Sequence, residues 1–416
     1  MDCGGDPTLP PPAKSPKLLN PTTTIDSLGD DILLDIFLLL PSLASLIRAA
    51  LTCQAWRRAV ASSRAFRHRF RELHPAPLLG LVTEPQKDAL PSFAPAQRRD
   101  RDVLAAIRGG DFSLTFLLDP NDYACDAPPL HWHIHDCQDG FLLLMNWDAG
   151  LLATVNPLAL QFTDYIEMPI DRKTGPPQPG VPTSLDVHLI CSDEDPMSFR
   201  LVWLFYMESA VQVAVFSSGM GWFFHPLVDI AERAPPHNAG EHWLHFGLQS
   251  NGVLYWPFKN MEHVLKLDTK TMEFSVLKLP PNMDHSYSFV VGETMNGTLW
   301  VVYCTGWSID VFRYDGVDRW ISAGQIQYEI ETDPPADNDT LCVVTMKDGF
   351  AYFATPDMIL FLCLETMALD TLIPRSFRAR HFHPYIMAWP PCLVLGNYGS
   401  FAEIQDGANE PKECGT

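Results

Sequence analysis

The spacing of apolar residues changes once along this chain, near residue 75. Before that point, apolar residues recur at helical intervals in three short segments, and an arginine-rich segment, Arg64–His74, continues the same spacing. After it, short apolar runs are separated by Gly, Pro, Asn and Asp, which is typical of strands joined by turns. The sequence therefore predicts a multidomain chain, with a small all-α domain over residues 24–74 and an all-β domain over residues 75–400.

The first helical segment is apolar on nearly every side. From Ile32 to Leu40 only Asp35 is polar. A surface helix of a small domain normally has one apolar stripe, and an apolar excess usually marks an interface. Pro41 ends the segment, because proline disfavours helical geometry in the preceding residue and has no N–H to donate. We therefore expect the rest of the chain, a partner protein or both to cover this segment.

This region resembles the F-box, the helical module of three short helices that docks substrate receptors onto the SKP-type adaptor of cullin–RING ubiquitin ligases. The matching positions are Leu28, Asp30, Ile32-Leu33-Leu34, Asp35, Ile36, Leu40-Pro41, Ser45-Leu46, Arg48, Cys53, Trp56-Arg57 and, more loosely, Phe66. The sequence departs from the family at Gly29, where proline is usual, at Gln54, where lysine is usual, and at Ser62-Ser63, where Asp-Pro is frequent. The resemblance implies docking on the adaptor, and the residues expected to contact it are Leu28, Ile32, Ile36, Leu40, Pro41, Leu46 and Trp56.

A loose repeat runs through the β region. Glycine follows Asn or Asp, and an apolar run comes next, at Asp139-Gly140, Asn251-Gly252, Asn296-Gly297 and Asp348-Gly349. Such pairs favour tight hairpin turns, because both residues tolerate a positive φ. The last three copies lie 45 and 52 residues apart, the length of a four-stranded propeller blade. We therefore expect a β-propeller of about six blades.

The two ends of the β region are expected to meet in the last blade. Strands near residues 384–397 would pair with strands near residues 77–118, so that the ring has no open sheet edge. The region also resembles the F-box-associated β-propellers, kelch-like in rhythm, of large plant F-box families, on Asn156-Pro-Leu158, Val215–Gly219 with Trp222, and Trp256–Leu279. The resemblance implies a substrate-recognition domain that binds a target protein.

Charge and cysteine usage narrow the range of partners. The net charge is −21, and residues 81–416 hold 43 Asp/Glu against 20 Lys/Arg, so we expect no binding to nucleic acid and none to membranes. Ten cysteines occur without a Cys-x-x-Cys pair or a secretory signal, which indicates reduced thiols and a cytoplasmic or nuclear location. Residues 1–23 are rich in Pro and Thr, and residues 401–416 are polar. We expect a disordered leader and a flexible tail there.

One run of histidines suggests chemistry. On a strand, His131, His133 and His135 would share a face and could converge on zinc or iron. The run lacks a spaced fourth ligand. The alternative is that the three histidines lie on the polar face or at the edge of an ordinary strand and bind no metal. No nucleophile elbow and no phosphate-binding loop is present in the sequence. We therefore expect no catalytic residue, no cofactor and no metal.

These observations favour a substrate-receptor subunit of an SCF-type ubiquitin ligase. In this hypothesis the helical module binds the adaptor and the propeller binds a target protein that the sequence does not name. Two alternatives stay open at this point. One is a metal-dependent propeller enzyme that uses His131, His133 and His135. The other is an F-box scaffold without a role in degradation, or a sugar-binding receptor of the lectin-like kind.

Overall fold

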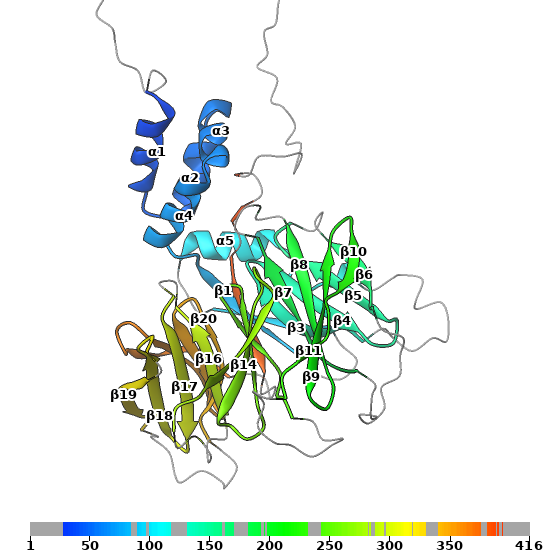
Figure 1. The fold of residues 1–416 in the computed structure, drawn as a ribbon. Helices are drawn as coiled ribbons and strands as arrows, with labels where there is room; N and C mark the ends of the chain where they lie inside the picture. The colour runs from blue at the N-terminus through cyan, green and yellow to red at the C-terminus, as the bar shows by residue number, and fades with distance from the viewer. Residues whose placement is uncertain are drawn as a thin grey trace, which may run out of the picture. The chain divides into compact units, whose positions relative to one another are not determined.

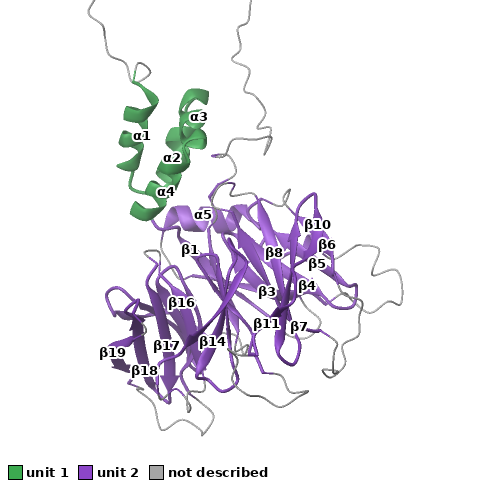
Figure 2. Cartoon of the chain, in the orientation of Figure 1, with its two compact units in different colours: residues 1–74 green, residues 75–416 purple. Residues whose placement is uncertain are grey.

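The chain forms two compact units, Met1–His74 and Pro75–Thr416 (Figure 2). A computed structural model describes residues 28–84, 90–96, 100–117, 131–159, 163–169, 182–192, 195, 198–231, 243–281, 283, 288–294, 297–317, 319–329, 340–375, 381–387, 389–390 and 393. The expected leader, residues 1–23, and the expected tail, residues 401–416, lie outside the described residues. The change from helices to strands falls at the boundary between the two units.

Four helices make up the described part of the first unit (Figure 1). They are α1 (Asp30–Leu38), α2 (Leu43–Ala50), α3 (Gln54–Ser62) and α4 (Arg64–Leu73). Ser42 and Ser63 cap α2 and α4, since their hydroxyls accept hydrogen bonds from the N–H groups of Ser45 and Phe66, each at 3.2 Å. Arg67 is buried and donates to the carbonyl of Ala61 at 2.6 Å. None of the helices in the described residues is long and apolar enough to cross a membrane.

Described strands of the second unit form six antiparallel sheets. The first three in chain order are β3 (His133–Gln138) to β4 (Phe141–Asn146), β5 (Leu151–Val155) and β6 (Asp164–Glu167); β7 (Thr183–Cys191) to β8 (Phe199–Tyr206), β9 (Ala210–Ser217) and β10 (Gly221–Phe224), with β11 (Val228–Asp229) on β9; and β12 (Leu248–Ser250) to β13 (Val253–Pro257), β14 (His263–Asp268) and β15 (Glu273–Lys278).

Two more sheets have the same sequential order. They are β16 (Ser288–Glu293) to β17 (Leu299–Thr305), β18 (Ser308–Tyr314) and β19 (Trp320–Gln327), and β20 (Cys342–Lys347) to β21 (Phe350–Ala354), β22 (Met358–Cys363) and β23 (Leu369–Pro374). In the sixth sheet the order is β2 (Ser92–Pro95), β1 (Leu78–Thr83) and β24 (Phe382–Ile386), so it combines both ends of the unit.

Pairing between β1 and β24 closes the ring. Leu81 lies opposite Pro384 and Val82 opposite His383 in an antiparallel register. On its other sides, β24 contacts β3 and β20, the first strands of the neighbouring sheets. The second unit is therefore a six-bladed β-propeller, which confirms the predicted fold and its closure from both ends. The kelch-like rhythm stays a prediction.

Three of the four hairpin turns expected from the repeat are present, and the fourth includes Asn296, which lies outside the described residues. In Asp139-Gly140, Asn251-Gly252 and Asp348-Gly349 both residues have positive φ, at 45° and 79°, 50° and 75°, and 51° and 80°. These turns join β3 to β4, β12 to β13 and β20 to β21, with the φ values that a two-residue type I′ turn requires.

Only part of the region expected to supply closing strands is extended. Of residues 77–118, β1 and β2 are strands, whereas Arg101–Gly109 forms the helix α5 and Thr115–Leu117 a short 3₁₀ turn. The apolar residues pack instead of pairing: Phe112 stacks on Phe93 with ring centroids 4.1 Å apart, and Leu114 and Leu117 are buried. At the other end, where strands near residues 384–397 were expected, β24 ends at Ile386 and most of residues 388–397 lie outside the described residues.

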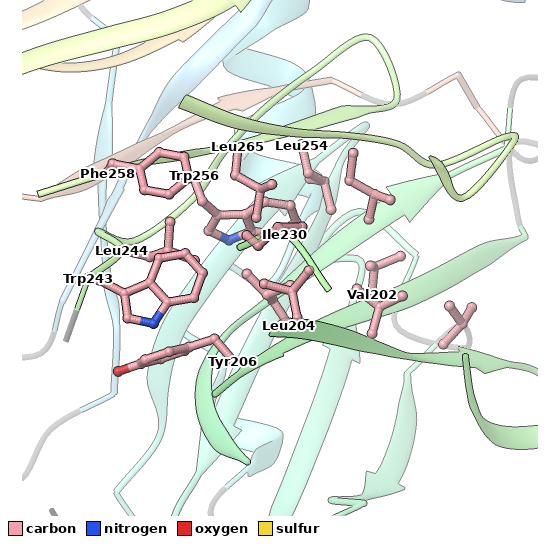
Figure 3. Packing of buried hydrophobic residues seen from close by; sticks show 14 of the residues in the cluster. Val202, Leu204, Tyr206, Ile230, Trp243, Leu244, Leu254, Trp256, Phe258 and Leu265 are labelled. Carbon is pink, nitrogen blue, oxygen red and sulfur yellow. The ribbon is translucent and has the colours of Figure 1, made fainter. Parts of the chain in front are cut away.

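The hydrophobic core lies between neighbouring blades. Figure 3 shows one such region, where Val202 and Leu204 of β8 pack with Leu254 and Trp256 of β13. All four side chains are fully buried. Each blade therefore needs its neighbours to bury the apolar faces of its strands.

Hydrogen bonds between first strands also join consecutive blades. In each case a side-chain oxygen on one blade accepts a backbone N–H of the next blade. The pairs are Asp136 with Leu189 at 2.9 Å, Asp186 with Gly247, Ser250 with Glu293 at 2.9 Å, and Ser288 with Val343 at 3.0 Å. These four links therefore join five consecutive blades through their first strands or the residue just before one.

Candidate functional site

Helix α1 has two adjacent apolar stripes. Leu33 and Phe37, four residues apart, are buried inside the helical unit. Ile32, Ile36 and Leu39 lie on the neighbouring stripe with side chains 54%, 39% and 83% exposed. The spacing i, i+4, i+7 places these three on one helical face, which is the pattern of anchors that insert into an apolar groove of a partner. The apolar excess seen in the sequence is thus divided between the core and an exposed surface.

The other helices support α1 from one side. Leu43, Leu46 and Ala50 of α2 are buried, and the indole ring of Trp56 meets Phe37 edge to face, with centroids 5.5 Å apart. One imidazole nitrogen of His74, after α4, lies 3.1 Å from the carbonyl oxygen of Leu38, at the end of α1. These contacts fix the direction of the exposed stripe.

The predicted adaptor-contact residues divide into three groups. Ile32, Ile36 and Pro41 are exposed. Leu28, Leu40 and Trp56 are partly buried. Leu46 is 0% exposed, so it stabilises the helical unit and cannot be a surface anchor as the sequence suggested. We assign Leu46 to the core, which corrects that prediction.

Two exposed apolar residues escaped the sequence analysis. Leu39, 83% exposed, continues the stripe of Ile32 and Ile36, and Leu51, 47% exposed, follows α2. A signal for Leu39 existed, because it lies seven residues after Ile32. Gly29, where the F-box usually has proline, adopts φ −66° at the N-cap of α1, which is the φ that a proline ring imposes. The departure therefore leaves the helix entry in its usual geometry.

The histidine run does not form the site that its spacing suggested. His131 precedes β3, and the Nδ1 atom of His133 lies 3.3 Å from a carboxylate oxygen of Glu84. A β-bulge at His135 shifts the register between Ile134 and Asp136 and breaks the regular alternation of faces. In the described part of the chain, no three His, Cys, Asp or Glu side chains gather in a way that could hold a metal ion.

A buried ion cluster lies beside this bulge instead. His188 of β7 has Nε2 at 3.3 Å from Asp186 Oδ2 and Nδ1 at 3.8 Å from Asp136 Oδ2. Burial disfavours the imidazolium, but the close negative charges of Asp186 and Asp136 outweigh it and raise the pKa of His188 to about 10. Burial also acts on the two carboxyl groups, yet the interactions with His188 hold their pKa values below the ordinary range.

Every carboxylate of this cluster has further partners. Asp136 accepts the N–H of Cys137 at 2.7 Å and that of Leu189, and Asp186 accepts the indole N–H of Trp256 at 2.8 Å and the N–H of Gly247. The partners come from three blades, so the cluster links these three blades to one another. Burial lowers the pKa of His135 and of His383 to about 4, which keeps both imidazoles neutral near pH 7.

Glycines and cysteines of the described residues have structural roles. The turn between β9 and β10 contains Gly219 and leads into Gly221, and both have positive φ. The described cysteines are free thiols, and burial raises the pKa of Cys137 and Cys304 to about 12, which opposes nucleophilic use.

Comparisons with known proteins agree with the two units. A family model described as F-box-like matches residues 25–72, and one described as F-box protein AT5G49610-like, beta-propeller, matches residues 133–393. No curated protein matches the chain.

Solved structures that resemble the chain are distant. Apo AztD from Citrobacter koseri is 10% identical, with 62% of this chain and 74% of that chain covered and a TM-score of 0.35. A protein from Lactobacillus plantarum is 11% identical, with 58% and 70% covered and a TM-score of 0.36. A structure of YCF48 bound to D1 peptide is 12% identical, with 59% and 68% covered and a TM-score of 0.33. These likenesses carry no argument about function.

The two family models account for both units. The F-box model covers α1 to α3 and nearly all of α4, and the propeller model covers every strand from β3 to β24, more than half of the chain. The chain is therefore a plant-type F-box protein and belongs to the F-box protein AT5G49610-like β-propeller family.

Proposed function

We propose that this protein is the substrate-receptor subunit of an SCF-type ubiquitin ligase. The F-box binds an SKP-type adaptor, which links it to the cullin–RING ligase, and the propeller binds a target protein. An F-box followed by a propeller fits this architecture, and the family typically acts as an adaptor rather than as an enzyme. Ubiquitin transfer is then catalysed by other subunits, and this chain supplies proximity. Such a complex works in the cytoplasm or nucleus, where we expect this protein.

One observation carries the proposal: the exposed stripe formed by Ile32 and Ile36 of α1 and by its C-cap residue, Leu39. The F-box already buries a complete apolar stripe of its own through Leu33 and Phe37, so the second stripe is not needed for its core. Apolar anchors of this kind are favourable only when a partner removes them from water. No comparable arrangement favours the metal-enzyme alternative, because its three histidines are not brought together as ligands in the described residues.

We expect the double substitution Ile32→Ser and Ile36→Ser to weaken adaptor binding strongly. Interface anchors typically cost about 2 kcal/mol or more when truncated, roughly thirtyfold in affinity for each. The measurement is titration of purified SKP-type adaptor onto the full chain, with melting temperature as a check on folding. The matched control is Leu73→Ser, which removes an aliphatic side chain of similar exposure, 48%, from α4. Wild-type affinity of the double variant would refute this assignment of the adaptor surface.

Leu46→Ala separates packing from binding. Because Leu46 is fully buried, we expect the substitution to destabilise the F-box by about 2–5 kcal/mol, as for other Leu→Ala changes in cores. The measurement is circular dichroism of an isolated F-box fragment, residues 24–74, during heating. The helical signal of the variant should be lost at a lower temperature than that of the wild type. Unchanged stability together with lost adaptor binding would instead return Leu46 to the contact surface.

A further inference from the structure

The largest group of exposed apolar side chains on the described propeller lies in one short stretch of its second blade. Met220, Phe223, Phe224 and Leu227 are 85%, 63%, 44% and 49% exposed. They belong to β10 and the residues on either side of it, and we call them the β10 patch. Contiguous exposed apolar residues on a soluble domain usually mark a binding surface.

Strand β10 is also an outer strand with a free edge. Among the described residues it pairs only with β9, with Phe223 opposite Val215 and Phe224 opposite Ala214. The N–H of His225 donates to Val213 at 2.9 Å, and in an antiparallel ladder such inward bonds alternate along the strand. The N–H groups of Trp222 and Phe224 therefore point away from β9, where another strand can accept or donate.

The other outer strands carry a charged residue, a proline or a bulge, whereas β10, which is as short as β2 and β6, carries none of the three. Natural edge strands are protected by charged residues, prolines or bulges. Such features are Pro95 in β2, Asp164 and Glu167 in β6, Glu273 and Lys278 in β15, a bulge at Ala323 in β19, and Asp370 with Pro374 in β23. Strand β10, Gly221-Trp-Phe-Phe224, has none of these and pairs with β9 in unbroken register.

Among the described residues, the surroundings of the patch are acidic. From Leu201 to Asp229 the sequence contains no Lys or Arg, while Glu208 and Asp229 are exposed. The neighbouring strand β6 adds exposed Asp164 and Glu167, and the indole N–H of Trp222 donates to the carbonyl of Glu167 at 2.8 Å, which places β6 beside β10 (Figure 1). A basic partner is therefore favoured. A second copy of this chain is disfavoured, because each copy has a net charge of −21.

We propose that the β10 patch binds an extended basic segment of the target protein, which adds to the sheet as a strand beside β10. Main-chain hydrogen bonds to the outward groups of Trp222 and Phe224 set the register, and apolar side chains of the segment pack on Phe223, Phe224 and Leu227. Lys or Arg residues of the segment face the carboxylates of β6. The inference rests on the proposed function, since it locates the target site of a substrate receptor.

The test uses a displayed library of random ten-residue peptides selected against the purified full chain. We expect the selected peptides to combine apolar residues at alternate positions with Lys or Arg. Synthetic copies, measured by fluorescence anisotropy, should bind roughly tenfold or more weakly to the variant Phe223→Ser/Leu227→Ser. The matched control is Val317→Ser/Ile321→Ser, which removes two exposed aliphatic side chains, 79% and 42% exposed, in the fourth blade. Binding should also weaken at high ionic strength, because the partner charges are exposed.

A second pair of variants tests strand addition itself. Phe224→Thr and Phe224→Pro both remove the aromatic ring, but only proline removes the outward N–H without disturbing an inward bond to β9. We expect the proline variant to bind the selected peptide several-fold more weakly than the threonine variant, with similar melting temperatures. Equal binding by the two would overturn the strand-addition geometry.

Three other results would overturn the proposal. These are a library that yields no basic peptide, peptides whose binding is insensitive to the β10 variants, and concentration-dependent dimerisation of the wild type that Phe223→Ser abolishes. Adaptor titration on the same proteins keeps the two proposals apart. Normal adaptor affinity with failed peptide binding rejects only the β10 site, whereas absent adaptor binding by the wild type rejects the receptor function.

Discussion

A fragment of residues 75–416 should fold as an intact propeller, and a fragment of residues 120–416 should not. The longer fragment begins at the boundary between the two units and retains every described strand. The shorter one lacks β1, β2 and α5, so β24 loses the strand with which it pairs. It also loses Leu78, Leu79, Leu81 and Val82, which are all buried.

The expected size of this effect follows from the burial. Four fully buried aliphatic side chains contribute roughly 1.5–3 kcal/mol each, which approaches the whole net stability of about 5–15 kcal/mol of a typical domain. The open edge of β24 and the uncovered faces of its neighbours would also promote aggregation. Size-exclusion chromatography and thermal unfolding followed by circular dichroism would distinguish the fragments. A fragment ending at residue 400 keeps every described strand and serves as the control.

One result would contradict the need for β1. A monomeric 120–416 fragment that unfolds cooperatively at the temperature of the 75–416 fragment would mean that β1 is dispensable. The ring would then be closed by other strands. Pairing of the two ends of the unit, as β1 with β24, would no longer explain the stability of the propeller.

In the F-box, the apolar pattern predicts the helices but not which apolar face is buried. The sequence is enough to predict the helices and to show that α1 carries more apolar surface than one face can bury. It does not say which of two adjacent stripes faces inward, because Ile32 and Leu33 differ by one position and have the same chemistry. That choice depends on how α2 and α3 pack, and this is why Leu46 was misplaced and Leu39 was missed.

In the propeller, too, some elements were predictable from the sequence and others were not. Strands next to a Gly turn were predictable, since Asn-Gly and Asp-Gly encode the turn locally. Outer strands such as β19 and β23 were missed, because they are half exposed and their alternation is weak. The inter-blade links were also missed, although an aspartate inside an apolar first strand, as at Asp136 and Asp186, was a visible signal. Their partners lie 53 and 61 residues away, a distance that no local pattern reports.

We expect the ion cluster around His188 to contribute to the stability of the propeller. The imidazole and both carboxylates are buried, and each carboxylate is bonded to a backbone N–H of the next blade. Removing the positive charge leaves two carboxylates buried without it. Breaking a buried ion pair in this way typically costs about 3–5 kcal/mol, so we expect a loss of this size for His188→Gln near pH 6.

The stability that His188 contributes should fall as the pH rises. The pKa of His188 is about 10 in the folded protein, above the roughly 6.5 of an unfolded chain. Its stabilisation is therefore complete below about pH 6.5 and is lost as the pH rises toward 10. The pKa values of Asp136 and Asp186 are lowered, so their stabilisation is present above the ordinary carboxyl range and is lost only as the pH falls through the folded values.

Urea unfolding of the 75–416 fragment, measured between pH 6 and pH 10, tests this directly. The wild type should lose stability steadily across the interval, whereas His188→Gln should start lower and change less, so that the two curves converge near pH 10. The control, His381→Gln, changes an exposed imidazole next to β24 and should follow the wild-type curve within about 0.5 kcal/mol, as surface substitutions usually do. A gap between the wild type and His188→Gln that stays constant with pH would show that His188 acts through packing, because a cavity does not titrate. A gap that narrows would identify the imidazolium charge as the group that holds Asp136 and Asp186, and with them three blades, in place.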